Sequence, residues 1–350
     1  MTISDDTIKR AVARYQREYD RYLKLAARVA DICRSEIVEG NAIRAQVTSR
    51  AKSPKSLDGK LRRFAQSGKK AMADVDAVFE QIRDLSAVRV ATYEQRHEDH
   101  VVSLVSRRFI DHQGNPPVPD RKDKNRDNAD NFYRATHLEV FLKPSDIVGT
   151  YANVAEVPCE IQVCSMMAHV WNEVEHDLGY KPAAGVLSPA ERRFLKMLGS
   201  SVRTGDDTIE SLFAETERRQ REQGGAFTDV YDFVARVRGW FPAVPDFGRN
   251  AGALFEALQP MRLVSPDSIQ KAVGLPEPLT TAAQLAAEDL ARRIRGQPRF
   301  NLDTSSSDLL LVLLLPKAAS FLARTEPSSE GAARVRWFAE QYLKTNVGAA

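Results

Sequence analysis

Two acidic residues, Asp84 and Glu160, stand beside segments with the pattern of β-strands. Residues 87–92 form an apolar run shortly after Asp84, and in residues 157–163 Glu160 and Gln162 alternate with aliphatic residues. Because side chains alternate between the faces of a strand, Glu160 and Gln162 are predicted to project from one face. Carboxylates held on neighbouring strands suit a hard cation such as magnesium. Each acid taken alone is equally consistent with an ordinary surface residue.

Residues 44–70 carry nine Lys or Arg residues against a single acid. Within this segment Arg50, Lys52, Ser56 and Lys60 follow one another around an expected loop that opens a helix. Backbone N–H groups at a helix start and side-chain cations both favour phosphate groups. No glycine-rich cradle precedes the lysines, so the segment is not a Walker A loop. The segment suits a nucleotide triphosphate, but taken alone a solvated basic face is the more ordinary interpretation.

An aromatic and basic group, residues 131–137, precedes another expected strand. The ring of Tyr133 could stack on a nucleobase, since aromatic side chains stack on bases of any type. His137 follows four positions later. In the alternative interpretation, Phe132 and Tyr133 are core anchors and His137 is a strand histidine with satisfied hydrogen bonds.

A helix expected after Glu160 carries His169, Glu173 and His176, which share one face because they are four and three positions apart. That spacing also suits metal ligands. The order of residues nevertheless differs from the H-E-x-x-H motif of zinc peptidases, so the sequence does not indicate zinc.

The elements that would position these residues follow from the periodicity of apolar residues. The first 38 residues are expected to be helical, and a loop at Pro54 leads into a short helix from Ser56. Residues 111–131, rich in Pro, Asn and Asp, are expected to form a mobile loop. Strands are expected at 87–92, 135–142 and 157–163. Further helices are expected at 75–83, 97–109, 166–178, 189–202, 206–223, 227–239, 249–258, 280–295, 307–324 and 331–344.

The composition is that of a globular protein, with 43% hydrophobic and 28% charged residues. A net charge of +3 provides no overall field for nucleic-acid binding. The three cysteines, Cys33, Cys159 and Cys164, form no C-x-x-C pair and indicate neither a disulfide framework nor a zinc site. The N-terminus lacks the apolar stretch of a signal peptide, and the longest apolar run, residues 309–315, is too short to span a bilayer. A cytoplasmic protein without a membrane partner is expected.

In order and spacing, these pieces resemble the synthetase domain of the RelA/SpoT family, which makes the alarmones pppGpp and ppGpp. The likeness runs over about residues 44–181. Its most specific part is similar to the family's E-[IV]-Q-[IV] strand and H-x-W-x-E-x-E-H-x-x-x-Y-K helix. These motifs correspond to EIQV at residues 160–163 and HVWNEVEHDLGYK at residues 169–181.

The resemblance implies an α+β fold with a nucleotidyltransferase-like mixed β-sheet flanked by helices and followed by a helical C-terminal region. The chain would be a small alarmone synthetase with a C-terminal extension. Residues 1–40 are expected to be an N-terminal helix, and residues 41–224 a synthetase-like domain with its following helices. Residues 225–350 are expected to be a helical domain, for which a regulatory role is a hypothesis.

The activity that the resemblance implies is that of an ATP-dependent GTP pyrophosphokinase, which moves the β,γ-pyrophosphate of ATP to the 3′-hydroxyl of GDP or GTP and releases AMP. Asp84 and Glu160 would hold Mg²⁺, and Glu160 would take the proton from the hydroxyl. The residues matched to the ATP site are Arg50, Lys52, Ser56, Lys60 and Arg89, with the adenine between the two arginines. The residues assigned to the acceptor site are Tyr133, His137 and Gln162. The resemblance also implies a homo-oligomer.

Three positions depart from the family pattern. Ala87 replaces a glycine, Phe132 replaces the glycine before the tyrosine, and Cys164 replaces an arginine. The latter two changes concern the acceptor half of the site, so other acceptors stay open beside GDP and GTP. These are adenosine nucleotides and the 3′ end of tRNA, the latter being the target of the toxic small synthetases of the family. A catalytically silent nucleotide-sensing module is the alternative from a different class.

Overall fold

The structure, a computed structural model, describes residues 3–68, 72–123, 132–179, 187–221, 225–244, 246–294, 296 and 298–346. Contacts within the chain divide it into two units. Unit 1 consists of Met1–Arg34 and Ala45–Glu210, and unit 2 consists of Ser35–Arg44 and Ser211–Ala350. Residues 35–44 connect a helix of unit 1 to the first strand of unit 1, yet they belong to unit 2. The sequence did not indicate this.

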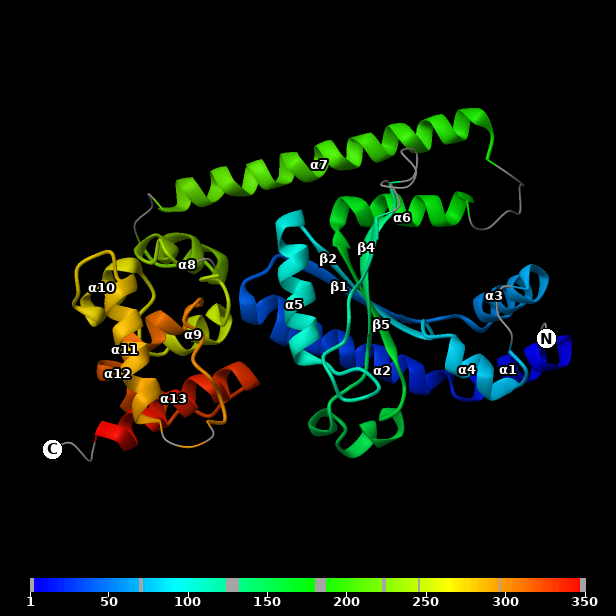
Figure 1. Cartoon of the computed structure of the whole chain (residues 1–350). Helices are drawn as coiled ribbons and strands as arrows, with labels where there is room; N and C mark the ends of the chain where they lie inside the picture. Colours follow the sequence, from blue (N-terminus) through cyan, green and yellow to red (C-terminus); the bar gives the residue numbers. More distant parts are fainter. Residues whose placement is uncertain are drawn as a thin grey trace. The chain divides into compact units, whose positions relative to one another are not determined.

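Unit 1 is built on a five-stranded mixed sheet with the strand order β1-β2-β5-β4-β3 (Figure 1). Strands β2 and β5 run parallel, and the other neighbouring strands are antiparallel. This arrangement confirms the expected mixed sheet flanked by helices. The strands are β1 (Ala45–Ala51), β2 (Ser86–Thr92), β3 (Asp120–Asp123), β4 (Arg134–Val140) and β5 (Cys159–Ser165). The helices are α1 (Asp5–Arg17), α2 (Tyr19–Ile32), α3 (Pro54–Ser67), α4 (Val75–Gln81), α5 (Glu98–Arg108), α6 (Met166–Gly179) and the first part of α7 (Pro189–Arg221).

The two faces of the sheet differ in polarity. Val88, Ile161 and Leu138 are buried on one face, which α2 and α5 cover. The Ser86 hydroxyl, on this same face, donates a hydrogen bond of 2.9 Å to the backbone oxygen of Tyr22 in α2. The opposite face carries the polar residues of β5, and α6 packs across part of it (Figure 1). The sheet is thus an apolar support on one side and a platform for polar side chains on the other.

Several predicted elements differ from the structure. The first 38 residues form α1 and α2, which part at Glu18, followed by a π-helical turn (Cys33–Val38) rather than one helix. Strand β1 lies where a basic loop was expected, and β3 lies inside the expected loop 111–131. The rest of that loop prediction includes residues 124–131, which lie outside the described residues. Helix α7 is continuous where two helices were expected.

Unit 2 is helical, as expected for the C-terminal region. Its core gathers around α12, whose leucines are almost all buried. The sequence did not predict α10. The helices are α8 (Val230–Val237), α9 (Ala251–Leu258), α10 (Pro266–Val273), α11 (Thr280–Arg293), α12 (Asp308–Leu322) and α13 (Glu330–Asn346). Among the described residues, no helix combines the length and the apolar character that crossing a bilayer requires.

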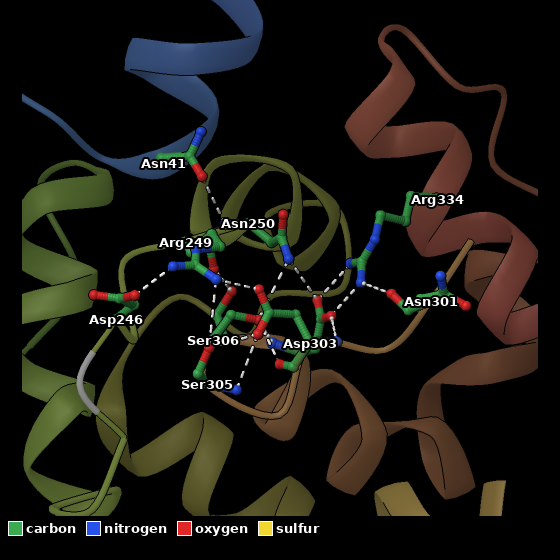
Figure 2. Close-up of polar contacts among 11 residues, drawn as sticks. Asn41, Asp246, Arg249, Asn250, Asn301, Asp303, Ser305, Ser306 and Arg334 are labelled. Carbon is green, nitrogen blue, oxygen red and sulfur yellow. Dashed lines mark hydrogen bonds and ion pairs between the residues drawn. The ribbon is translucent and has the colours of Figure 1, made fainter. Parts of the chain in front are cut away.

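A buried polar network joins the segments of unit 2 (Figure 2). Asp308 accepts hydrogen bonds from Arg334 of α13 and, at 3.2 Å, from the side-chain amide of Asn250. The backbone N–H of Asn250 donates to the side chain of Asn41 at 3.4 Å. The Asn41 amide in turn donates to the backbone oxygens of Glu36 and Ile37 at 2.9 and 2.8 Å. Residues 35–44 are therefore bound into unit 2 by specific hydrogen bonds.

Candidate active site

The register of the sheet brings five of the predicted site residues onto one face. Arg50 of β1 is opposite Ala87 of β2, and Ala87 is beside Glu160 of β5. Two residues further along the strands, Arg89 is beside Gln162, which is opposite His137 of β4. Side chains in such cross-strand positions are direct neighbours. Residues far apart in the sequence therefore form a compact polar surface.

Glu160 is held by hydrogen bonds from both sides. Its Oε1 is 3.0 Å from Nδ1 of His137, and its Oε2 accepts a 2.7 Å hydrogen bond from the Gln162 amide. Burial raises the pKa of this carboxyl. The hydrogen bond and charge of His137, together with the hydrogen bond from Gln162, outweigh burial and hold the pKa below its usual range. Glu160 is therefore ionised at neutral pH and aimed by its neighbours.

Asp84 lies between two lysines. Lys52 Nζ is 3.0 Å from Oδ2, and Lys60 Nζ is 2.9 Å from Oδ1. Burial again opposes ionisation, yet the two ammonium groups lower the pKa of Asp84 below its usual value. The charge of Asp84 also acts on Glu160, where it raises the carboxyl pKa slightly against the other effects. The charges of the two predicted metal ligands therefore interact.

Arg89 is fixed by α6. One of its terminal nitrogens, Nη1, lies 2.7 Å from a carboxylate oxygen of Glu173 and 2.9 Å from Nδ1 of His169. The other, Nη2, donates to the Gln162 side-chain oxygen at 3.2 Å. Burial and the charge of Arg89 lower the pKa of His169, which favours the neutral ring. The helix face that had the spacing of metal ligands thus orients an arginine instead.

A cavity of about 230 Å³ is lined by both predicted adenine-binding arginines. The small side chain of Ala87 lies between Arg50 and Glu160 in the register, so that position leaves room on the face. Planar guanidinium groups that line a cavity suit a flat aromatic ring. The lining residues are Thr48, Ser49, Arg50, Ala87, Val88, Arg89 and Gln162.

Tyr133 and His137 form the other end of the polar surface. The Tyr133 hydroxyl lies 2.8 Å from Nε2 of His137. Cys164, where the resemblance predicts an arginine, is buried with Ala135 and Ala168, and Tyr133 packs against this cluster. The position therefore makes an apolar contact.

Ser56 lies in the first turn of α3. Helix α3 begins at Pro54 and is capped by Ser53, whose hydroxyl accepts the backbone N–H of Ser56 at 3.1 Å. The Ser56 hydroxyl is exposed and lies 2.8 Å from that of Ser53. Among the other residues of the resemblance, Asn131, Tyr180 and Lys181 lie outside the described residues.

Sequence reasoning missed two groups on this surface. Glu139 lies opposite Glu160 in the register and pairs with Arg83 at 3.3 Å. The alternation of Leu138, Glu139 and Val140 could have revealed it. Lys122 of β3 places Nζ 3.3 Å from Nδ1 of His137, a contact that depends on a strand the sequence did not predict.

Magnesium is the metal that the resemblance implies, and the residues present fit it. Asp84 and Glu160 offer hard oxygen atoms, and both have lowered pKa values. Mg²⁺ usually binds one or two carboxylates together with substrate phosphates. Within the described ranges, His, Cys, Asp and Glu side chains form no cluster of three or more that could hold a metal.

Helix α7 supports the start of β4 through a close approach at Gly199. A Cβ atom there would lie 2.2 Å from the ring of Phe132, which packs against Trp171 at 6.1 Å between ring centroids. Gly199→Ala should therefore displace Phe132 and with it Tyr133, lowering stability by about 1–3 kcal/mol despite alanine's better helix propensity. Thermal unfolding tests this. Gly239→Ala, where nothing lies within 4 Å, is the control, and equal effects of both changes would contradict the argument.

A buried charge cluster beside the site predicts a pH dependence of stability. Arg134 Nη2 lies 3.1 Å from both Glu98 and Asp206. Burial raises the pKa of Glu98 from 4.5 to about 7. The folded chain then binds more protons than the unfolded chain between these values, so the contribution of Glu98 to stability is complete below pH 4.5 and is lost as the pH rises toward 7.

The expected loss is on the order of 1–3 kcal/mol. Urea unfolding at pH 5 and pH 7.5 should show that Glu98→Gln removes part of the decrease seen in the unchanged chain. The exposed neighbour Asp99, also in the first turn of α5, provides the control Asp99→Asn. A decrease of unchanged size in Glu98→Gln would show that Glu98 does not titrate in this range.

Comparisons with known proteins agree with the resemblance. Residues 49–184 match the family model described as the region found in RelA/SpoT proteins. No relative among curated proteins matches the chain.

Several solved structures are similar. Small alarmone synthetase 1 from Bacillus subtilis is 18% identical, with a TM-score of 0.46, over 59% of this chain and 98% of that chain. A GTP pyrophosphokinase family protein from Streptococcus pneumoniae is 19% identical, with a TM-score of 0.44, over 59% of this chain and 96% of that chain. Small alarmone synthetase 2 from Bacillus subtilis is 21% identical, with a TM-score of 0.42, over 57% of this chain and 99% of that chain.

Proposed function

We propose that this chain, whose residues 49–184 match the RelA/SpoT family model, is an ATP-dependent pyrophosphokinase that acts on GDP or GTP. It would transfer the β,γ-pyrophosphate of ATP to the 3′-hydroxyl of the acceptor and release AMP. The observation that supports this most is the combination of ionised Glu160 on the polar face of the sheet, Asp84 with its two lysines, and the cavity lined by Arg50 and Arg89.

The donor would be bound by cations already in place. Lys52 and Lys60 would exchange part of their contact with Asp84 for the phosphates of ATP. Arg50 and Arg89 would hold the adenine ring between them in the cavity that they line. Ser56, at the exposed start of α3, would contribute its hydroxyl and the helix N-terminus to phosphate binding. Most of the catalysis would then be positioning and charge stabilisation.

The transfer forms a bond between the 3′-oxygen and the β-phosphorus and breaks the bond from the β-phosphorus to the oxygen that it shares with the α-phosphorus. AMP leaves with that oxygen. Glu160 would accept the proton of the 3′-hydroxyl, since its carboxylate is ionised and its direction is set by His137 and Gln162. Bound magnesium, held by Asp84 and Glu160, would supply charge neutralisation at the phosphates.

The acceptor would lie at the other end of the surface, with its base on Tyr133 and its sugar near His137 and Gln162. The register puts these residues next to Glu160, where a hydroxyl could meet the base. In this arrangement, GDP and GTP remain the proposed acceptors. Adenosine nucleotides and the tRNA 3′ end stay as alternatives that experiment distinguishes.

The test is thin-layer chromatography of reactions with γ-labelled ATP. GDP, GTP, ADP, unlabelled ATP and bulk tRNA are supplied in separate reactions, with Glu160→Gln as a parallel control. Label on GDP or GTP supports the proposal. Label on tRNA alone would move the assignment to a toxin, and label on adenosine nucleotides alone would change the acceptor. Transfer to none of them would leave the nucleotide-sensing module.

We further propose that unit 2 regulates the synthetase and that the chain forms a homo-oligomer in a cytoplasmic setting. Truncation at residue 224 would divide unit 2, because residues 35–44 belong to it. A substitution such as Asp308→Ala, which breaks the network with Arg334 and Asn250, is the better probe. Unchanged transfer rates in that variant would count against regulation by unit 2. Light scattering reports the oligomeric state.

A further inference from the structure

Helix α1 lies before the matched region 49–184 in the sequence, but one of its side chains contacts the segments that carry Lys52 and Asp84. Its Tyr15 is fully buried, and the hydroxyl donates a hydrogen bond of 2.7 Å to the backbone oxygen of Lys52. The same hydroxyl lies 3.3 Å from the backbone oxygen of Leu85. One side chain therefore bridges two segments that are distant in the sequence.

These two segments carry the central ion pair of the donor site. Lys52 contributes the ammonium group that contacts Asp84 at 3.0 Å, and Leu85 directly follows Asp84. The backbone N–H of Lys52 donates to the oxygen of Leu85 at 2.9 Å. The Tyr15 hydroxyl thus closes a small network that fixes the backbones from which Lys52 and Asp84 project.

The surroundings of Tyr15 make it a rigid anchor. Its ring lies 5.7 Å from that of Tyr19 and 4.9 Å from that of Tyr22, between centroids. Burial, the largest cause, raises the pKa of Tyr15, so the hydroxyl keeps its proton at neutral pH and can donate. A side chain with two χ angles, held on both sides, keeps its hydroxyl in one place.

Helix α1 also contacts the other elements of the donor site. Asp5 pairs with Arg62 of α3, the helix that carries Lys60, at 2.9 Å. Arg14 pairs with Asp76 of α4, the helix that leads to Asp84, at 2.6 Å. Both pairs are at the surface and contribute little by themselves. The buried hydroxyl of Tyr15 is the contact that sets the geometry.

We propose that Tyr15 is a positioning residue of the donor site, which holds Lys52 and Asp84 at the spacing needed to receive magnesium-bound ATP. The functional part of this inference rests on the proposed pyrophosphokinase activity. Tyr15 contacts no reacting atom and acts through the backbones of Lys52 and Leu85. Its loss should therefore affect the use of ATP more than the use of the acceptor.

The test compares Tyr15→Phe with Tyr22→Phe in the full chain. Both remove one hydroxyl from the same buried aromatic cluster, but only Tyr15 bridges Lys52 and Leu85. In Tyr15→Phe the KM for ATP should rise about fivefold because Lys52 is less well held, and kcat should fall by about two- to fivefold because Asp84 shifts with it. The acceptor KM should stay within about twofold, as expected from the loss of one hydrogen bond. In Tyr22→Phe all three constants should stay within about twofold. An unchanged KM for ATP in an active Tyr15→Phe chain would overturn the proposal.

A second measurement needs no catalysis. Hydrogen exchange by mass spectrometry should show faster exchange in peptides that contain the Lys52 amide in Tyr15→Phe, and no change there in Tyr22→Phe. Equal exchange in both variants would overturn the inference. If the unchanged chain transfers no label while exchange follows the expectation, the proposed function fails and the positioning of the Lys52–Asp84 pair by Tyr15 stands.

Discussion

Replacing Glu160 with glutamine is expected to lower kcat for pyrophosphate transfer by about 10³-fold or more. The variant keeps the shape of the side chain and removes its charge. It thereby removes both the proposed proton acceptor and one proposed magnesium ligand. The amide that replaces one carboxylate oxygen would also face a donor, since His137 and Gln162 each approach one of the two oxygens.

The matched control is Glu139→Gln. Glu139 lies opposite Glu160 in the register of the same sheet, and its carboxylate pairs with Arg83. Glu139→Gln should therefore lower kcat by no more than about threefold, because the ion pair that it removes is partly exposed. Initial rates with saturating ATP and acceptor measure both variants. Full activity in Glu160→Gln, or an equal loss in Glu139→Gln, would show that Glu160 has no special role.

The polar face around Glu160 could be predicted because strand alternation is a local signal. Glu160 and Gln162 are separated by one aliphatic residue, and the structure puts both on the face opposite the buried Ile161 and Val163. The partners of Glu160 could not be predicted in this way. His137 reaches it through antiparallel pairing of β4 with β5, which depends on the order of strands in the sheet.

Strand β1 shows where local signals fail. Its sequence, AQVTSRA, has little apolar alternation because it is an edge strand with mostly exposed side chains. The local sequence therefore predicts a loop at Arg50, although pairing with β2 is what places it opposite Ala87. The bridging role of Tyr15 was equally inaccessible, since its partners lie 37 and 70 residues away.

Helix α7 illustrates the opposite error, in which a local signal suggested a break that packing overrides. Gly205 lies in the gap between the helices expected at 189–202 and 206–223, and a glycine weakens a helix interior. In the structure, a Cβ atom at Gly205 would lie 2.5 Å from Met167 of α6. The glycine therefore allows a close contact between α7 and α6, and the helix continues through it.

Replacing Asp84 with asparagine is expected to separate binding from turnover. The kcat should fall by about 10²–10³-fold, because a proposed magnesium ligand is lost. Binding of ATP should stay within about threefold or improve, because Lys52 and Lys60 lose the carboxylate that competes with the triphosphate for them. A change that lowers kcat without weakening ground-state binding removes an interaction needed in the transition state.

Titration calorimetry with a non-hydrolysable ATP analogue, with and without magnesium, measures the binding part. Asp76→Asn is the control, because Asp76 is an exposed acid on nearby α4 whose partner is Arg14. In Asp84→Asn, magnesium should strengthen analogue binding less than it does in the unchanged chain and in Asp76→Asn. If magnesium strengthened binding equally in all three, Asp84 would be a counter-ion for the lysines and not a ligand of the metal. In that case, the two acids would differ only in how their charge is balanced. Two lysines neutralise Asp84, whereas His137 and Gln162 orient Glu160.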